Sequence, residues 1–266
     1  MPAETRFHPR IEGAIRSIFK RFGIGITGYS RLQQLTEGFQ AAADLKFLGA
    51  QPEAYIVPAL RLLARSKSQF RQDLFALTSS GMKRGGYFVE FGATNGVDLS
   101  NTWLLEKEFG WRGILAEPGK IWHEALRQNR SSVIETNCVW SASGQKLDFK
   151  ETAFAELSTV KTFASSDAYA SARQYGISYQ VETISLQDLL DKHRAPRNVD
   201  YLSIDTEGSE LEILSGFDFN SYRFSTITCE HNHRPVRDDI RRLLASHGYE
   251  RKFEDISQYD DWFVCG

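Results

Sequence analysis

The chain has 266 residues, a net charge of −2 and 41% hydrophobic residues, which suits one α/β domain with an extension or two small domains. No apolar run approaches the roughly 18 residues of a membrane span, and the N-terminus lacks a signal-peptide core, so we expect a cytoplasmic protein. The three widely separated cysteines, Cys138, Cys229 and Cys265, lack metal-ligand spacing and fit a reducing compartment.

Charge divides the chain at residue 67. Residues 1–67 carry a net charge of +5 and residues 68–266 a net charge of −7. An acidic body argues against nucleic acid as the main partner, because phosphate neutralisation needs clustered Lys and Arg. Because residues 1–67 differ in character from residues 68–266, we predict an N-terminal helical extension over 1–67 and a separate domain over 68–266.

The extension contains apolar residues at helical spacing over residues 11–22, with basic residues among them. We expect this helix to pack its apolar face on the main domain. A weaker alternative is contact with a membrane surface or a partner. Helices are also predicted over residues 32–47 and 55–66.

After a predicted helix over 68–77, an apolar strand over 87–91 runs into the turn Gly92-Ala93-Thr94-Asn95-Gly96. A helix is predicted over 98–109, followed by a strand over 112–116 that ends at Glu117. A strand, a glycine turn, a helix and a second strand with a terminal carboxylate form a nucleoside-binding half-site.

The turn indicates which nucleoside cofactor the half-site holds. It lacks the G-x-G-x-x-G pattern that places a pyrophosphate on a helix N-terminus, which disfavours an NAD-dependent oxidoreductase. S-adenosylmethionine has no phosphate and needs a close backbone approach and a carboxylate for its ribose. Glu90 could hold its ammonium group, directly or through water, and Glu117 its ribose hydroxyls. Alternatively, Glu90 is an isolated strand-end charge and Glu117 an acid that stabilises a helix N-terminus.

Strands and helices continue to alternate in the second half of the chain. Strands are predicted over 132–139, 199–204 and 224–229, and Ser185 with Asp188 resembles a capping box. The segment 141–180 is an irregular insertion, which we interpret as a possible substrate lid. The last two apolar runs, 250–256 and 262–265, are too close for a helical crossover, so we expect an antiparallel hairpin.

This pattern predicts an α/β fold of the Rossmann-like class I methyltransferase type, with a mostly parallel seven-stranded sheet and an antiparallel C-terminal hairpin. Over about residues 68–266, the chain resembles the FkbM family of S-adenosylmethionine-dependent methyltransferases. The resemblance is carried by the turn at Glu90-Phe91-Gly92-Ala93, by Ala116-Glu117-Pro118, by Asp205-Thr206-Glu207-Gly208-Ser209-Glu210 and by Thr228-Cys229-Glu230-His231. It departs at Thr94-Asn95, where many relatives carry an acidic residue before the glycine.

The resemblance implies methyl transfer, usually to a hydroxyl oxygen of a sugar, glycan or natural product, while N-methylation stays open. It also implies that Gln72 folds over the cofactor and that Asn137 and Cys138 lie near the adenine. The residues expected to bind the cofactor are Gln72, Glu90, Gly92, Ala93, Asn95, Gly96, Glu117, Asn137, Cys138 and Asp205.

Methyl transfer to a hydroxyl also requires that the acceptor lose its proton, so a base or a metal is expected near it. Ligands gather at the carboxyl ends of the strands in such a fold, where Asp205, Glu230 and His231 lie. In one hypothesis His231 or Asp205 is a general base, oriented by Asp205 or Glu230. In the other, Asp205 and Glu230, with His231 or Asn232, bind a divalent metal such as Mg²⁺.

A binding module that has lost turnover is the non-enzymatic alternative. The intact set Glu90, Gly92, Gly96, Glu117 and Asp205 counts against it. The sequence leaves the acceptor and the oligomeric state open.

Overall fold

The computed structural model describes residues 29–152, 158–163 and 176–266. The amphipathic segment predicted over 11–22 lies outside these residues. The chain forms two compact units, Met1–Lys46 and Phe47–Gly266. Helix α2 (Tyr29–Gly49) runs from the first unit into the second. In the described part of the chain, no helix has the length and apolar character that crossing a membrane requires.

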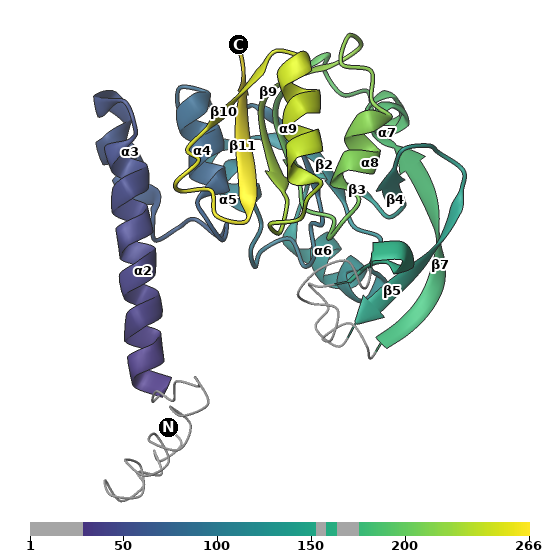
Figure 1. The fold of residues 1–266 in the computed structure, drawn as a ribbon, viewed down its shortest axis with the longest axis horizontal. Coiled ribbons are helices and arrows are strands. Elements are labelled where there is room, and N and C mark those ends of the chain that lie inside the picture. The colour runs from purple at the N-terminus through teal and green to yellow at the C-terminus, as the bar shows by residue number, and fades with distance from the viewer. Residues whose placement is uncertain (1–28, 153–157, 164–175) are drawn as a thin grey trace, which may run out of the picture. The chain divides into compact units, whose positions relative to one another are not determined.

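A seven-stranded sheet forms the centre of the larger unit (Figure 1), in the order β10-β11-β9-β8-β1-β2-β3. Strands β1, β2, β3, β8 and β9 pair in parallel, whereas β11 is antiparallel to both β9 and β10. The bounds of the strands are β1 Tyr87–Phe91, β2 Arg112–Ala116, β3 Val133–Glu135, β8 Asn198–Ile204, β9 Arg223–Glu230, β10 Tyr249–Lys252 and β11 Asp260–Cys265. The predicted Rossmann-like sheet and its terminal hairpin are confirmed.

Helices cover both faces of this sheet because successive strand residues point to opposite sides. In β1, Phe88 belongs to an apolar cluster with Tyr201, whereas Val89 belongs to a second cluster with Ile204. The helices of the larger unit are α3 Glu53–Leu62, α4 Gln72–Ser79, α5 Trp103–Phe109, the 3₁₀ turn η1 Lys120–Trp122, α6 His123–Asn129, α7 Leu186–Lys192, α8 Glu210–Ser215 and α9 Arg237–Ser246.

Residues before the predicted domain boundary at 67/68 contribute to this core. Phe47, Ala59 and Leu62 are buried in the same cluster as Phe88, and the Phe47 ring lies edge-on to Trp262 with the ring centroids 6.3 Å apart. The buried core of the larger unit therefore begins at residue 47, because α3 packs its apolar face on the domain.

The helix after β1 starts later than predicted. It begins at Trp103 and not near residue 98, because residues 92–102 form a loop with left-handed backbone at Gly92, Thr94, Gly96 and Leu99. A helix cannot pass through such residues, so the prediction of a helix over 98–109 was wrong in its first turn.

The predicted strand over 132–139 is also corrected. It breaks after Glu135, whose Oε1 accepts hydrogen bonds from the amides of Thr136 and Asn137 at 3.0 and 3.1 Å. The chain then enters a second sheet of order β4-β7-β5-β6, made of β4 Cys138–Trp140, β5 Lys146–Thr152, β6 Thr159–Val160 and β7 Gly176–Ser185.

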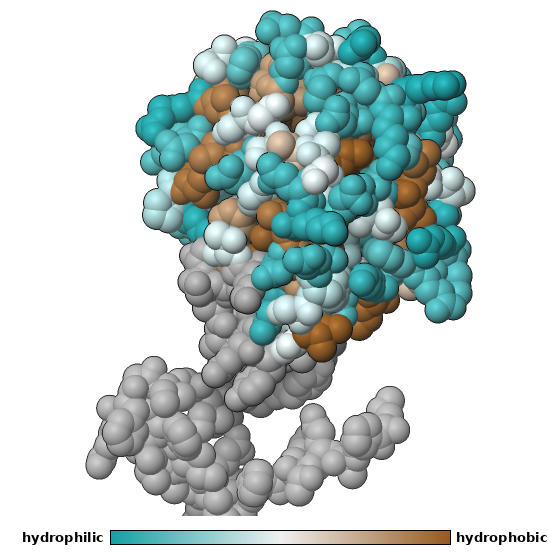
Figure 2. Space-filling view, turned by 90° about the vertical axis from the view of Figure 1, so that its right-hand side faces the viewer, coloured by the Kyte–Doolittle hydropathy of each residue, from teal (hydrophilic) through white to brown (hydrophobic). Residues whose placement is uncertain are grey.

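The described part of the expected irregular insertion thus includes regular strands. A small apolar core of Cys138, Phe149, Val160 and Val181 holds them together. Figure 2 shows the side of the molecule that carries these strands, which is mainly hydrophilic with apolar residues in separate small groups.

Candidate active site

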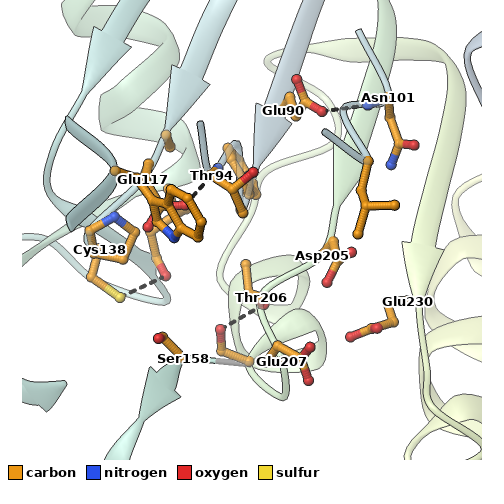
Figure 3. A pocket seen from close by; sticks show the side chains of 18 of the residues that line it. Glu90, Thr94, Asn101, Glu117, Cys138, Ser158, Asp205, Thr206, Glu207 and Glu230 are labelled. Atoms are coloured by element: carbon orange, nitrogen blue, oxygen red, sulfur yellow. Dashed lines mark hydrogen bonds between the residues drawn. The ribbon is translucent and has the colours of Figure 1, made fainter. Parts of the chain in front are cut away.

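A cavity of about 190 Å³ opens at the carboxyl ends of β1, β2, β8 and β9. The second sheet contributes Cys138, Phe149 and Val160 to its wall. Figure 3 shows Glu117 and Cys138 at one end, and Asp205, Glu207 and Glu230 at the other. The cavity therefore has two chemically distinct ends, both at the edge of the sheet where ligands bind in this fold.

At the first end, Glu117 is buried and follows β2 directly. Its carboxylate accepts hydrogen bonds from the amides of Thr94 at 2.9 Å and Gly119 at 2.6 Å. Burial raises the pKa of Glu117 to about 7, although these two hydrogen bonds oppose the increase. An ionised carboxylate has about four acceptor positions, so Glu117 can also accept bonds from a ligand.

The wall beside Glu117 is apolar and uncharged. It includes the Trp122 ring, Val139 and the Cys138 thiol, and burial raises the pKa of that thiol to about 12. The hydroxyl of Tyr179 holds η1 in place, because it accepts a bond from the Lys120 amide at 2.9 Å and donates to Glu151 at 2.7 Å. This end suits a flat, neutral ring beside a diol.

Glu90 lines the cavity, but its carboxylate bonds to the chain itself. It accepts hydrogen bonds from the Asn101 amide at 2.7 Å, from Ser100 Oγ at 3.2 Å and from Thr102 Oγ1. Arg130 lies 3.6 Å away. The Glu90 carboxylate therefore organises the loop over residues 92–102 and brings Asn101 into the cavity wall; contact with an ammonium group stays a prediction.

Arg130 completes this arrangement from the far side of the loop. Its side chain is fully buried and donates to the Gly96 carbonyl at 3.1 Å and to Thr102 Oγ1 at 2.8 Å. It also pairs with Glu106 at 3.0 Å. One arginine thereby ties β1, the loop and α5 together.

The residues of the turn shape the cavity more than they line it. Only Gly92 and Thr94 of the five reach its wall. Gly92 has φ +75°, and an added Cβ would overlap the carbonyl oxygen of Asp205. Ala93 is buried in the core, and Asn95 Oδ1 accepts bonds from the amides of residues 97 and 98 at 2.9 Å. A Cβ at Gly96 would overlap Arg130 and Leu126.

At the second end, three carboxylates converge from two strand ends. Asp205 and Glu207 follow β8, and Glu230 ends β9. One oxygen from each lies within 4.8 Å of the others. Burial, followed by the charge of Glu210, raises the pKa of Asp205 to about 6, and burial and the Asp205 carboxylate raise the pKa of Glu230 well above its usual range.

His231 follows Glu230 but is not part of the cavity wall. Its Nδ1 accepts a hydrogen bond from the His233 amide at 2.9 Å, and its Nε2 lies 3.6 Å from Asp261. Asp261 also pairs with Arg237 and Arg251, at 2.7 Å each. The geometry therefore favours Asp205 and Glu230 over His231 as groups that face a reactant.

Two other predicted residues also lie away from the wall. Gln72 donates to Asp260 at 2.7 Å, and the Asn137 amide donates to Glu135. Conversely, several lining residues were not predicted: Gln69, Asp98, Leu99, Asn101, Trp122, Phe149, Ser158, Val160, Thr206, Ser209 and Tyr259. Thr206 and Ser209 lie in the segment Asp205–Glu210 that resembles the family, and Gln69, Leu99 and Asn101 lie in two further segments similar to it. The others carry no comparable signal.

Comparison with known proteins agrees with this arrangement. The model of the Methyltransferase FkbM domain matches residues 90–251, which is more than half of the chain and includes Glu90, Glu117, Asp205 and Glu230. The chain belongs to this family of methyltransferases, as the sequence predicted. Membership implies S-adenosylmethionine as the methyl donor. No curated protein matches the sequence.

Two solved structures are distantly similar to this chain. One is a precorrin-6y C5,15-methyltransferase from Geobacter metallireducens, with 12% identity and a TM-score of 0.39 over 68% of this chain and 71% of that one. The other is a protein of Pyrococcus horikoshii described as an RNA methyltransferase, with 12% identity and a TM-score of 0.36 over 73% of this chain and 81% of that one. These superpositions are loose, so the family assignment rests on the family model.

Proposed function

We propose that this protein transfers a methyl group from S-adenosylmethionine to a hydroxyl oxygen of a small polyhydroxylated acceptor, such as a sugar, a glycan or a natural product. One observation carries the proposal: a single cavity joins the carboxylate of Glu117, which suits a ribose, to a group of carboxylates made of half-buried Asp205 and buried Glu207 and Glu230.

The first end of the cavity fits the donor. Glu117 has acceptor positions for a ribose diol, and Trp122, Cys138 and Val139 offer an uncharged surface for the adenine. Bound S-adenosylmethionine would supply a methyl group already activated on a sulfonium. The donor has a net positive charge, and six of the described lining residues are acidic while none is Lys or Arg.

The second end fits a hydroxyl acceptor. Asp205 and Glu230 have carboxylate oxygens within 4.8 Å of each other, and burial raises the pKa of Asp205 to about 6, so this pair can take up the proton of an acceptor hydroxyl near neutral pH. An acceptor amine would arrive already nucleophilic when neutral, whereas a hydroxyl needs this help. The acidic wall also disfavours phosphorylated acceptors, including nucleic acid.

Calorimetry with S-adenosylhomocysteine tests the donor site. We expect wild-type protein to bind it and Glu117→Gln to bind at least tenfold more weakly, while Glu124→Gln, an exposed change on α6, leaves the affinity unchanged. Absence of binding by the wild type, or full affinity in Glu117→Gln, would remove the ribose assignment. Saturable binding of NADH in its place would support the oxidoreductase alternative.

A second assay tests the acceptor assignment. Labelled S-adenosylmethionine would be incubated with a panel of neutral sugars, amino sugars and sugar phosphates, followed by mass spectrometry of the product linkage. Methyl ethers on neutral polyols support the proposal. Exclusive N-methylation, or a preference for phosphorylated acceptors, would contradict it.

A further inference from the structure

We propose that Asp205, Glu207 and Glu230 bind a divalent cation at the acceptor end of the cavity. The inference that a cation binds stands on the geometry of these residues. Only its role in the reaction rests on the proposed function. Glu207 adds a third ligand to Asp205 and Glu230, the pair that the sequence predicts.

The spacing of the three carboxylates suits such an ion. Their nearest oxygens lie within 4.8 Å of one another. Ca²⁺ binds oxygen at 2.3–2.6 Å and Mg²⁺ at 2.0–2.1 Å, so opposite ligands lie up to about 5 Å apart around calcium and about 4 Å apart around magnesium. Three oxygens within 4.8 Å of one another are close enough to bind one such ion together after small side-chain movements.

A second observation is independent of this spacing. Glu230 is 9% exposed, and its buried Oε2 accepts no hydrogen bond from the described residues. Its carboxylate points toward Asp205 and Glu207 (Figure 3). A buried carboxylate oxygen without a partner costs free energy, and a cation between these side chains would supply that partner.

Three arginines near this end, within the part of the chain that the structure describes, pair with other carboxylates. Arg234 pairs with Glu210 at 2.5 Å, and Arg237 and Arg251 pair with Asp261. The repulsion between Asp205 and Glu230 can therefore be relieved in two ways, by a shared proton or by a cation. The raised pKa values of both groups describe the first solution, and a bound cation would lower both.

A cation here would have a clear chemical effect. Its charge favours the ionised form of a hydroxyl placed next to it, and oxygen ligands are those that Ca²⁺ and Mg²⁺ prefer. If the proposed function is correct, the ion would lie where the acceptor hydroxyl loses its proton.

The test is calorimetry with the metal alone. The full chain would be stripped with EDTA, dialysed at pH 8 and titrated with Ca²⁺, Mg²⁺ or Mn²⁺. We expect saturable binding of one cation per chain, weakened at least tenfold in Glu207→Gln and in Glu230→Gln. Glu212→Gln, an exposed change on α8, should bind as the wild type does. Circular dichroism would verify that each variant is folded, and either carboxylate variant alone suffices.

The outcomes separate this inference from the proposed function. Binding of S-adenosylhomocysteine by the stripped chain without any cation binding would overturn the cation site and leave the shared proton. Unchanged cation affinity in both variants would also overturn it. Loss of cofactor binding in the wild type would overturn the proposed function, while the cation titration would still decide the site.

Discussion

The guanidinium of Arg130 lies 3.6 Å from the carboxylate of Glu90, and the two side chains are 0% and 3% exposed. Burial raises the pKa of Glu90, while the Arg130 charge is the largest influence that lowers it. The pair lies directly behind the loop that forms one wall of the cavity.

Removing Arg130 should therefore destabilise the domain strongly. Arg130→Ala leaves Glu90 buried without a counter-charge, which typically costs about 3–5 kcal/mol. Urea unfolding followed by circular dichroism would measure it. Arg127→Ala, an exposed change on α6, the helix that Arg130 directly follows, should stay within about 0.5 kcal/mol of the wild type. Equal losses in the two variants would contradict a special role for Arg130.

Gly92 and Gly85 have similar backbone conformations but different surroundings, so they allow a controlled comparison. Both have left-handed backbone, with φ of +75° and +68°, but a Cβ would overlap Asp205 at Gly92 and would meet nothing within 4 Å at Gly85. Gly85→Ala should cost only the left-handed strain of about 1–2 kcal/mol. Gly92→Ala should cost more and also abolish binding of S-adenosylhomocysteine, since β1 and β8 must separate. Thermal unfolding and calorimetry would measure both effects, and similar behaviour of the two variants would refute the close approach.

Three carboxyl groups with raised pKa values predict how stability depends on pH. Burial raises the pKa of Asp260 to about 7, of Glu117 to about 7 and of Asp205 to about 6. A pKa that is higher in the folded than in the unfolded chain gives stability that is complete below the unfolded value, near 4, and lost as pH rises through the folded value. In EDTA, the unfolding temperature should therefore fall between pH 5 and pH 8.

The contribution of Asp260 to this pH dependence of the unfolding temperature can be measured separately. Its carboxylate accepts a hydrogen bond from Gln72 at 2.7 Å. Asp260→Asn cannot ionise, so its unfolding temperature should fall less steeply over the same range. Asp238→Asn, on the exposed side of α9, should follow the wild type. A rise in wild-type stability toward pH 8 would show that these groups are not buried in the ligand-free protein.

The capping box at α7 offers a smaller and cleaner prediction. Ser185 Oγ accepts from the Asp188 amide at 3.0 Å and donates to the Asp188 carboxylate at 2.8 Å, as the sequence indicated. Ser185→Ala should lose about 0.5–2 kcal/mol in urea unfolding. Ser246→Ala, in the last turn of α9, loses only a bond to a carbonyl and should change stability less. An equal loss would exclude the cap as the cause.

The sequence predicted the features that depend on local pattern. Apolar runs located β1, β2, β8 and β9, and the short separation of the last two runs predicted the hairpin. Glu117 could be chosen because a carboxylate directly after a parallel strand must lie at the ligand edge of the sheet. The same reasoning placed Asp205 and Glu230 at the other end of the cavity.

Features that depend on distant contacts could not be read in the same way. The loop over 92–102 takes its shape from Arg130, which lies far along the chain. The local pattern does not contain this contact, and it therefore predicts a helix that begins too early, at residue 98. The direction of the His231 side chain is a second feature of this kind. Neighbouring residues in an extended chain point to opposite sides, so Glu230 and His231 cannot both face the cavity. The hydrogen bond from the His231 amide to the Tyr259 carbonyl at 2.8 Å fixes the backbone at this position.

The break after Glu135 affects how the domain can diversify. Because of this break, the second sheet contacts both ends of the cavity. Cys138 in β4, its near edge, lies beside Glu117, while Thr159 in β6, its far edge, donates to the carbonyl of Glu207 at 3.0 Å. The near edge is fixed by pairing with β7 and by Tyr179. Under the proposed function, changes along the far edge can therefore reshape the acceptor end of the cavity while the donor end keeps its form, so that one scaffold could acquire new acceptors without rebuilding its cofactor site.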